Sequence, residues 1–473
     1  MNTTQIQDAV KVLEKKIASV KGSLTLNDAA SITGLAVDEA KDALDTMMSR
    51  YVCRLMVTDN GDMIYSFGSS LQRRGEKTLA EKMEQVGEWL WKAFTVFFKA
   101  WIAITLVVYF VIFLVILIGL LVAASQGGNR DRKSPVRLDG IFNIFFSIFQ
   151  WRTATRMINY QMDRDGYRYR QYEPKKSYIN EKKKNFIASV YDFVFGPERV
   201  KTDPLANAKE VAAYLRQSKG IVTPAELVAL AGWKMDEAES FLSDCIVRFK
   251  GDAVISDNGV VYGKFDQITR GTGEVDGGKI EHYWDEYEPE YEITGNKTGR
   301  NALIVFMNLF NLFFASSILS GFYSSRPVYV GQHDTLVLIF LGYLPFVFSL
   351  LFFTVPLSRA WKVMKLRRER NDMNKRKRVM KVIFKRNDKS ASVEEIMKEI
   401  NSVSGEKAMS QSEVEACLEK MMKDFQGETT LDADGKVKYS FYRIAEQYAE
   451  AVRLRAGRKE DSKLGDVIFD SKN

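Results

Sequence analysis

Three long stretches of the 473-residue chain contain no charged residue, and they limit its fold more than any other feature. They cover residues 100–124, 301–323 and 335–356. A helix of about 20 apolar residues crosses the roughly 30 Å hydrocarbon layer of a membrane, whereas the core of a soluble protein rarely needs so long an apolar run. The sequence therefore predicts an integral membrane protein with aqueous parts between these runs.

The second and third runs are joined by the short segment 322–334, so we expect residues 301–357 to form a transmembrane helical hairpin. Asn308 and Asn311 lie three residues apart, on one face of the first helix of this hairpin. Amides inside lipid usually hydrogen-bond a neighbouring helix, so we interpret the pair first as packing contacts and second as a polar site. Pro345 is expected to kink the third run.

The distribution of lysine and arginine predicts the orientation, because cytoplasmic loops carry an excess of both. Residues 358–386 hold many bases, whereas segment 322–334 holds only Arg326. We therefore expect a bacterial inner-membrane protein with both flanks of the hairpin in the cytoplasm. Bases lie on both sides of the first run, so residues 94–125 are expected to bend back as a re-entrant segment; a single span is the alternative. The apolar residues 140–156 are too few to cross and suit a helix in the membrane interface.

Internal similarity is the second informative feature of the chain. Residues 21–67 align with residues 219–265 without a gap, and 13 of the 47 positions are identical. A third copy follows at an offset of 374 residues from the first. In every copy a glutamate precedes a turn glycine by 22 residues, and a phenylalanine follows that glycine by six. These residues are Glu39, Gly61 and Phe67; Glu237, Gly259 and Phe265; and Glu413, Gly435 and Phe441.

Each copy predicts three helices followed by a β-hairpin. Thr223 and Pro224 are typical of a helix start, with threonine as the cap and proline in the first turn. The third helix has apolar residues at the helical period, and Asn-Gly between β-forming residues indicates a tight hairpin turn. This order is that of a winged-helix domain, and the apolar matches are interpreted as core. The turn residues are Asn60, Gly61, Asn258, Gly259, Asp434 and Gly435.

A winged helix suggests DNA binding, because the third helix of many such domains enters the major groove. That helix then lies among phosphates and needs basic residues. The three candidate helices, residues 36–50, 234–249 and 410–424, carry twelve acidic residues and six basic residues between them. A DNA duplex would repel each of them, so the charges argue against nucleic acid as a partner. A protein-facing or solvated helix is the preferred interpretation.

Basic residues gather instead after the third apolar run, where they are expected to meet anionic lipid headgroups at roughly 1 kcal/mol per well-placed base. The same residues also serve as topology signals. The candidate membrane-surface residues are Lys362, Lys365, Arg367, Arg368, Arg370, Lys375, Arg376, Lys377 and Arg378.

The sequence offers no catalytic, cofactor-binding or metal-binding constellation. The only histidines are His282 and His333, and neither has a plausible nucleophile or metal-ligand partner nearby in the sequence. Cys53, Cys245 and Cys417 are far apart and form no C-x-x-C pair, which favours a reducing compartment. We therefore expect no enzymatic activity and no cofactor.

Residues 190–233, with the Phe-Gly-Pro lead-in at 195–197, resemble a family of poorly characterised bacterial and plastid membrane proteins. The resemblance covers roughly residues 100–265. It implies tandem winged-helix-like modules beside a long apolar segment, and it supplies no catalytic residue.

The expected fold class is mostly α with small β-hairpins, in which three winged-helix-like domains are linked by transmembrane or re-entrant helices. The expected function is a membrane-anchored scaffold that binds protein partners, or copies of itself, besides lipid. The alternatives are a membrane-tethered transcription regulator and a transporter or channel subunit. The expected segments are repeat 1 at 1–74; the membrane segment and interfacial helix at 75–156; a basic and aromatic linker at 157–200; repeat 2 at 201–270; an acidic linker at 271–300; the hairpin at 301–357; a basic juxtamembrane helix at 358–376; repeat 3 at 377–456; and a tail at 457–473.

Overall fold

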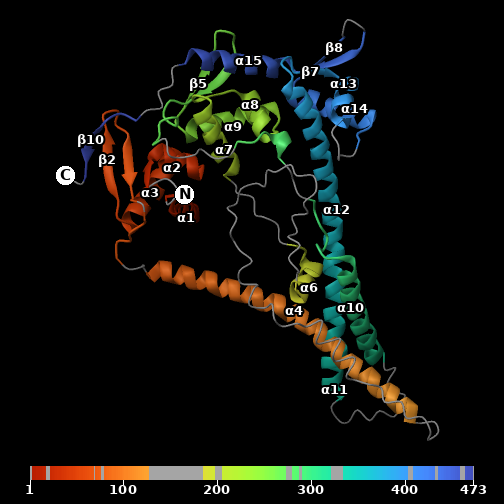
Figure 1. The fold of residues 1–473 in the computed structure, drawn as a ribbon. Helices are drawn as coiled ribbons and strands as arrows, with labels where there is room; N and C mark the ends of the chain where they lie inside the picture. Colours follow the sequence, from red (N-terminus) through yellow and green to blue (C-terminus); the bar gives the residue numbers. More distant parts are fainter. Residues whose placement is uncertain are drawn as a thin grey trace.

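In a computed structural model, the chain is mostly helical, and three small antiparallel sheets lie together at one end of three long helices (Figure 1). The structure describes residues 3–17, 22–68, 70–75, 79–126, 185–197, 205–272, 280–286, 290–320, 334–402, 408–431, 435–458 and 464–471. Predictions for residues 140–156, for most of the linker 157–200, for the hairpin loop up to residue 333 and for Asp434 lie outside these ranges.

Module 1, residues 3–66, consists of three helices, a short strand between the first two, and a final hairpin. The elements are α1 (Thr3–Ile17), β1 (Ser23–Thr25), α2 (Leu26–Thr33), α3 (Val37–Arg50), β2 (Arg54–Thr58) and β3 (Met63–Ser66). The short strand pairs with the second hairpin strand, so the sheet order is β1-β3-β2. The sequence did not predict β1.

Module 2, residues 206–264, repeats this order, and its sheet order β4-β6-β5 is equivalent. Its elements are α7 (Ala206–Gln217), β4 (Ile221–Val222), α8 (Pro224–Ala231), α9 (Met235–Arg248), β5 (Asp252–Ile255) and β6 (Val261–Lys264). The 3-10 turn η2 (Tyr283–Asp285) follows it and packs on α8.

Module 3, residues 377–440, takes the last turns of the long helix α12 (Leu344–Lys385) as its first helix. Its sheet order is β7-β9-β8, again the same arrangement. The other elements are β7 (Ser390–Ser392), α13 (Val393–Asn401), α14 (Gln411–Phe425), β8 (Glu428–Leu431) and β9 (Val437–Ser440), followed by α15 (Tyr442–Gly457) and the strand β10 (Val467–Asp470).

The residues that recur in the sequence have the same structural role in every module. The glutamate caps the third helix: the backbone N–H of Ala36 donates to Glu39 at 3.2 Å, and Lys234 and Ser410 donate equivalently to their glutamates at 3.0 Å. The turn glycine has a positive φ of 74° to 80°, which favours glycine. The phenylalanine is buried beneath the sheet in all three modules. The recurring residues therefore serve in capping, in the turn and in the core of each module.

Within the described residues, three helices are long and apolar enough to cross a membrane, by length and composition. They are α4 (Leu79–Gln126), α10 (Thr298–Leu319), and the continuous run of α11 (Asp334–Val337), η3 (Leu338–Tyr343) and α12. The segment η3 is a π-helix that ends directly before Leu344-Pro345, so the distortion expected at this proline takes the form of a widened turn.

The expectation of a bent first segment is wrong, because α4 is one continuous helix of 48 residues. At 1.5 Å per residue it is about 72 Å long, more than twice the thickness of a hydrocarbon layer. The chain reappears at α6 (Phe186–Phe195), which packs against the middle of α4 and against α12; the Phe193 and Phe352 rings are 5.6 Å apart. The connection from Gln126 to α6 lies outside the described residues.

One continuous hydrophobic core runs through all three modules, from Val10 in α1 through Leu227 in α8 to Ile396 in α13. Separate apolar clusters hold α4, α6, α10 and α12 together. The modules thus share their interior instead of standing apart on linkers, and the contacts between them are the natural place to look for the site.

Candidate functional site

Modules 1 and 2 are joined by a buried ion pair. Asp28 is the third residue of α2 and forms a capping box with Thr25, so its carboxylate is fixed at the helix start. The Asp28 side chain is fully buried, and Arg216 at the end of α7 reaches it at 2.7 Å. Because a buried charge without its partner is strongly unfavourable, this pair fixes the contact between the two modules.

The same contact has a close backbone approach at Gly34, which ends α2 with φ +71°. A Cβ at Gly34 would lie 3.0 Å from the Leu205 carbonyl oxygen of module 2. The Gly34 carbonyl in turn accepts a hydrogen bond from Arg248 at 3.0 Å. Glycine is therefore required here both by the left-handed backbone and by the neighbouring module.

Module 2 is joined to α15, the helix that follows module 3, by the equivalent carboxylate of α8. Glu226 forms the capping box with Thr223, is almost fully buried, and receives Arg455 of α15 through both oxygens at 2.7 and 2.8 Å. The Tyr214 hydroxyl donates to Glu226 at 2.7 Å, and the Arg455 guanidinium lies over the Tyr214 ring. Burial raises the pKa of Tyr214 well above its usual range, so this hydroxyl stays a donor.

Backbone groups of module 2 also bind α15 directly. The Ala225 N–H donates to the side-chain oxygen of Gln447 at 2.8 Å, and Arg455 donates to the Ile221 carbonyl at 2.7 Å. Asn258 at the hairpin turn donates to Glu450 of α15 at 2.7 Å. Helix α15, which directly follows module 3, therefore lies against module 2 and binds it through several hydrogen bonds.

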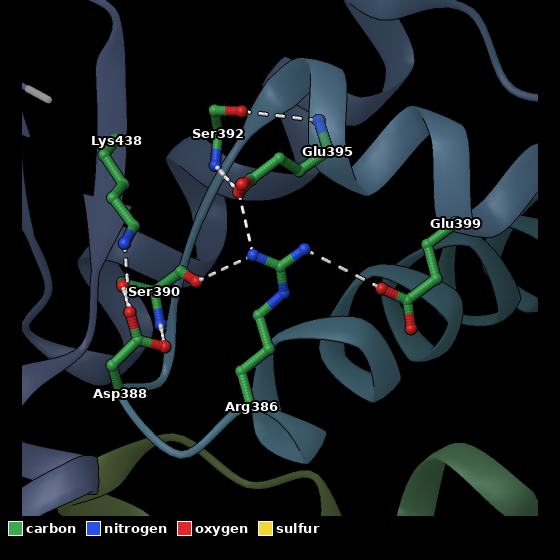
Figure 2. A network of polar contacts seen from close by, with 7 residues as sticks. All are labelled: Arg386, Asp388, Ser390, Ser392, Glu395, Glu399 and Lys438. Atoms are coloured by element: carbon green, nitrogen blue, oxygen red, sulfur yellow. Dashed lines mark hydrogen bonds and ion pairs between the residues drawn. The ribbon is translucent and has the colours of Figure 1, made fainter. Parts of the chain in front are cut away.

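Module 3 has the same carboxylate in a different setting. Glu395 of α13 forms the capping box with Ser392, and Arg386 from the end of α12 reaches it at 2.8 Å (Figure 2). Figure 2 shows this arginine between Glu395 and Glu399, with Asp388, Ser390 and Lys438 beside them. All of these residues belong to module 3, and the Glu395 side chain is 48% exposed. No second module covers this network in the described part of the chain.

The acidic third helices face basic residues of the same chain. Asp38 of α3 pairs with Lys250 of module 2 at 2.7 Å, and Glu239 of α9 pairs with Arg443 of α15 at 2.6 Å. Exposed pairs of this kind contribute about 0–1 kcal/mol each. They place one acid of each helix beside a base of a neighbouring element, and they neutralise part of the negative charge noted in the sequence.

Five of the predicted membrane-surface residues bind protein groups beyond α12. Arg367 donates to the Tyr291 carbonyl and lies 3.8 Å from the Glu290 carboxylate. Arg376 pairs with Asp424 of α14, and Lys375 pairs with Glu413 at 2.9 Å. The Lys375 ammonium lowers the pKa of Glu413 to about 2. Lys377 is buried and donates to the Glu286 carbonyl, and Arg378 donates to the Ile400 carbonyl.

Their position along α12 explains this difference from the expectation. Lys375 is 18 residues beyond Leu357, or about 27 Å along the helix axis, far more than the Debye length of about 8 Å. Lys377 and its three neighbours are therefore engaged with protein groups at a distance from the apolar part of α12. Lys362, Lys365 and Arg368 are exposed near the apolar part of α12, and Arg367 and Arg370 are half-buried there. Lipid contact stays a prediction for the whole set.

The two buried asparagines lie between the long helices. Asn308 donates to the Ser349 carbonyl of α12, and Asn311 donates to the Leu106 carbonyl of α4, both at 3.0 Å. Both side chains are fully buried. The amides therefore connect α10 to each of the other two long helices.

The titratable groups outside these contacts have packing roles. His282 stacks on Trp284 with ring centroids 4.6 Å apart, and burial lowers its pKa. Burial raises the pKa of Cys245 well above its usual range, so the thiol stays protonated. Among the residues that the structure describes, no three His, Cys, Asp or Glu side chains lie close enough to hold a metal ion.

Comparison with known proteins gives one distant relative. An uncharacterized chloroplastic protein of Arabidopsis thaliana is 24% identical over 381 residues, covering 74% of this chain and 68% of the plant protein. No protein-family profile matches the chain, and no solved structure matches it. The similarity confirms the plastid side of the resemblance noted in the sequence; the winged-helix domains and the Phe-Gly-Pro lead-in stay predictions.

Proposed function

We propose that the chain is a non-enzymatic, membrane-anchored interaction protein whose three winged-helix-like modules act as one rigid body. The three apolar helices are the anchor, and the modules bind protein partners at the cytoplasmic face of a bacterial inner membrane. The observation that carries the proposal is the pair of buried contacts Asp28–Arg216 and Glu226–Arg455. Each carboxylate is buried, so separating it from its arginine would leave an uncompensated buried charge.

The module contacts support a shared compartment. Asp28 of module 1 touches Arg216 of module 2, and Glu226 of module 2 touches Arg455 behind module 3, so a membrane cannot separate them in this arrangement. The bases after the third run support the cytoplasmic side. The two buried asparagines bind backbone carbonyls of neighbouring helices, which supports an anchor more than a transport path.

The charges of the third helices support protein partners over DNA. Asp38 and Glu239 point to bases of neighbouring elements, so these helices already face protein in this chain. A DNA duplex would have to displace these contacts and meet the remaining acids.

A mobility-shift titration with the intact detergent-solubilised protein tests the choice between protein and DNA. We expect no shift of random or genomic DNA fragments at physiological salt. A tight, sequence-selective shift would overturn the proposal. In parallel, purification from cross-linked membranes should yield a defined partner in near-stoichiometric amount with the intact chain, and not with a chain in which residues 1–75 are deleted.

Topology is tested with single cysteines at Asn60 and Asn258, in a background without Cys53, Cys245 and Cys417. A membrane-impermeant thiol reagent should label neither position in intact cells and both after lysis. Labelling of only one of them in intact cells would contradict the shared compartment.

A further inference from the structure

The last strand of the chain is bound to the first module. β10 pairs antiparallel with β2 as a fourth strand of the module 1 sheet, with Phe469 opposite Val57 (Figure 1). The Ser471 N–H donates to the Leu55 carbonyl at 2.9 Å, and the Leu55 N–H donates to the Ser471 hydroxyl at 3.0 Å. The two partners are more than 400 residues apart in the sequence.

This strand is held mainly by its backbone and by one charge. The side chains of Val467, Ile468 and Phe469 remain 49%, 69% and 56% exposed after docking. Arg54, the first residue of β2, forms an ion pair with Asp470. Addition of an extended segment to a sheet edge is a common mode of peptide recognition, in which backbone hydrogen bonds supply affinity and side chains supply specificity.

The charge at the start of the edge strand differs between the modules. Arg54, Asp252 and Glu428 occupy the same position of the hairpin, opposite Ser66, Lys264 and Ser440 respectively. Only β2 therefore offers a base to the acid of an incoming strand, whereas β5 and β8 offer a like charge. In the described part of the chain, the sheets of modules 2 and 3 end at β5 and β8 without a fourth strand.

We propose that the outer edge of β2 is a docking site for an extended peptide strand with three apolar residues followed by an acid, and that the C-terminal strand Val467–Asp470 keeps this site closed. The chain's own strand is the occupant in this structure and defines the ligand chemistry. A partner strand of the same pattern binds when the tail is released. This site deepens the proposed scaffold function by giving one partner-binding surface and its regulation.

The tail competes with a free peptide through its effective concentration, which is in the millimolar range for short flexible connections. A free peptide with a dissociation constant of about 100 µM should therefore bind the full chain about tenfold more weakly than a chain without the tail. The test uses a fluorescein-labelled peptide of residues 464–471 and fluorescence anisotropy with the intact protein in detergent. It compares the full chain with a chain that ends at Lys463.

Matched variants test the contribution of the Arg54–Asp470 ion pair. A peptide with Asp470→Arg should bind the truncated chain at least about fivefold more weakly, and truncated Arg54→Glu should restore its binding while it weakens binding of the natural peptide. A locked chain controls for misfolding: with Val57→Cys and Phe469→Cys in a background without the native cysteines, the full chain should bind no peptide when oxidised and regain binding when reduced with excess peptide.

Three results would overturn the proposal. They are no binding to the truncated chain, equal binding to full and truncated chains, or equal binding of a scrambled peptide. The outcome is separate from that of the proposed function, because peptide binding can be present when no cellular partner is recovered, and a partner can bind elsewhere when the peptide fails.

Discussion

Helices α8 and α13 begin with the same capping motif but lie in different environments. Both carry a capping box with a glutamate as third residue, Glu226 and Glu395, and both glutamates bind an arginine. In α8 every residue from Pro224 to Leu230 is buried, whereas α13 buries only Ile396 and Ile400. One local motif therefore forms a buried contact between module 2 and α15 where a neighbouring element covers it, and a surface ion pair where none does.

The difference can be read from the two sequences. Helix α8 reads PAELVALA, which is apolar on all sides, and such a helix is buried on all sides. Helix α13 reads VEEIMKEIN, which has one apolar stripe and a charged outer face. An array of stacked modules needs a polar outer face at its end, so α13 is the end of the array.

Loss of Arg455 should give the largest effect. Arg455→Ala leaves the Glu226 carboxylate buried without its cation, which costs about 3–5 kcal/mol in the free energy of unfolding. Denaturant titration of the intact protein in detergent, followed by circular dichroism, measures this change. The exposed counterpart Arg386→Ala is the control, with an expected loss of about 0–1 kcal/mol. Equal losses would remove the distinction between the two pairs.

Gly34→Ala should give a smaller but clear effect, because the new Cβ meets Leu205 of module 2 and the backbone is left-handed. We expect a loss of about 1–3 kcal/mol. Gly61→Ala is the matched control, since its φ is +80° and no atom lies within 4 Å of the new Cβ. It should lose only the cost of placing an L residue in a left-handed backbone, about 1–2 kcal/mol. A greater loss at Gly61 than at Gly34 would show that module packing adds nothing there.

Asn311→Ala should weaken the contact between α10 and α4 by about 0.6 kcal/mol, the mean for hydrogen bonds between membrane helices. The measurement is the thermal midpoint of the detergent-solubilised protein. Ser317→Ala on the same helix is a suitable control, because its hydroxyl is exposed and bonds only its own helix. An Asn311 variant that matches this control would argue against a packing role for the amide.

The smallest effect should come from the exposed polar network of module 3. It concerns how the free energy of unfolding changes with pH through Asp388. Burial alone would raise the pKa of Asp388, but hydrogen bonds from Ser390 and Lys438 hold it lower, at about 2. The folded-state pKa is depressed, so the stabilisation is present above about pH 4 and is lost as the pH falls through about 2. Because this side chain is 57% exposed, the loss should be under about 1 kcal/mol. Asp388→Asn should remove this pH-dependent part of the free energy of unfolding. If the pH profile of that variant is unchanged, the loss of stability at low pH comes from other groups.

Local sequence patterns were sufficient to predict the hairpin turns and helix starts, which depend only on nearby residues. The Asn-Gly turns predicted hairpins at Gly61 and Gly259, and both are present with left-handed glycines. The start of α8 was predicted as well, from Thr223 as the cap and Pro224 in the first turn, and both have these positions. Such features are fixed by backbone geometry within a few residues.

Contacts between distant segments could not be predicted in this way. Asp28 and Glu226 were not identified as candidate residues, because their arginines are 188 and 229 residues further along the chain. Lys377 was assigned to lipid because its sequence neighbours are basic, whereas the length of α12 carries it into module 3. The continuous α4 was missed because charge counting gives no information on helix continuity.

We propose that Glu226–Arg455 joins module 2 to α15 and thereby holds the three modules as one rigid body. Spin labels at Lys41 and Lys420, both exposed on third helices, would report the distance between modules 1 and 3 by pulsed electron resonance in detergent. We predict one narrow distance distribution for the otherwise natural chain and for Arg386→Ala, and a broad one for Arg455→Ala. A broad distribution in the natural chain, or a narrow one in Arg455→Ala, would contradict the claim.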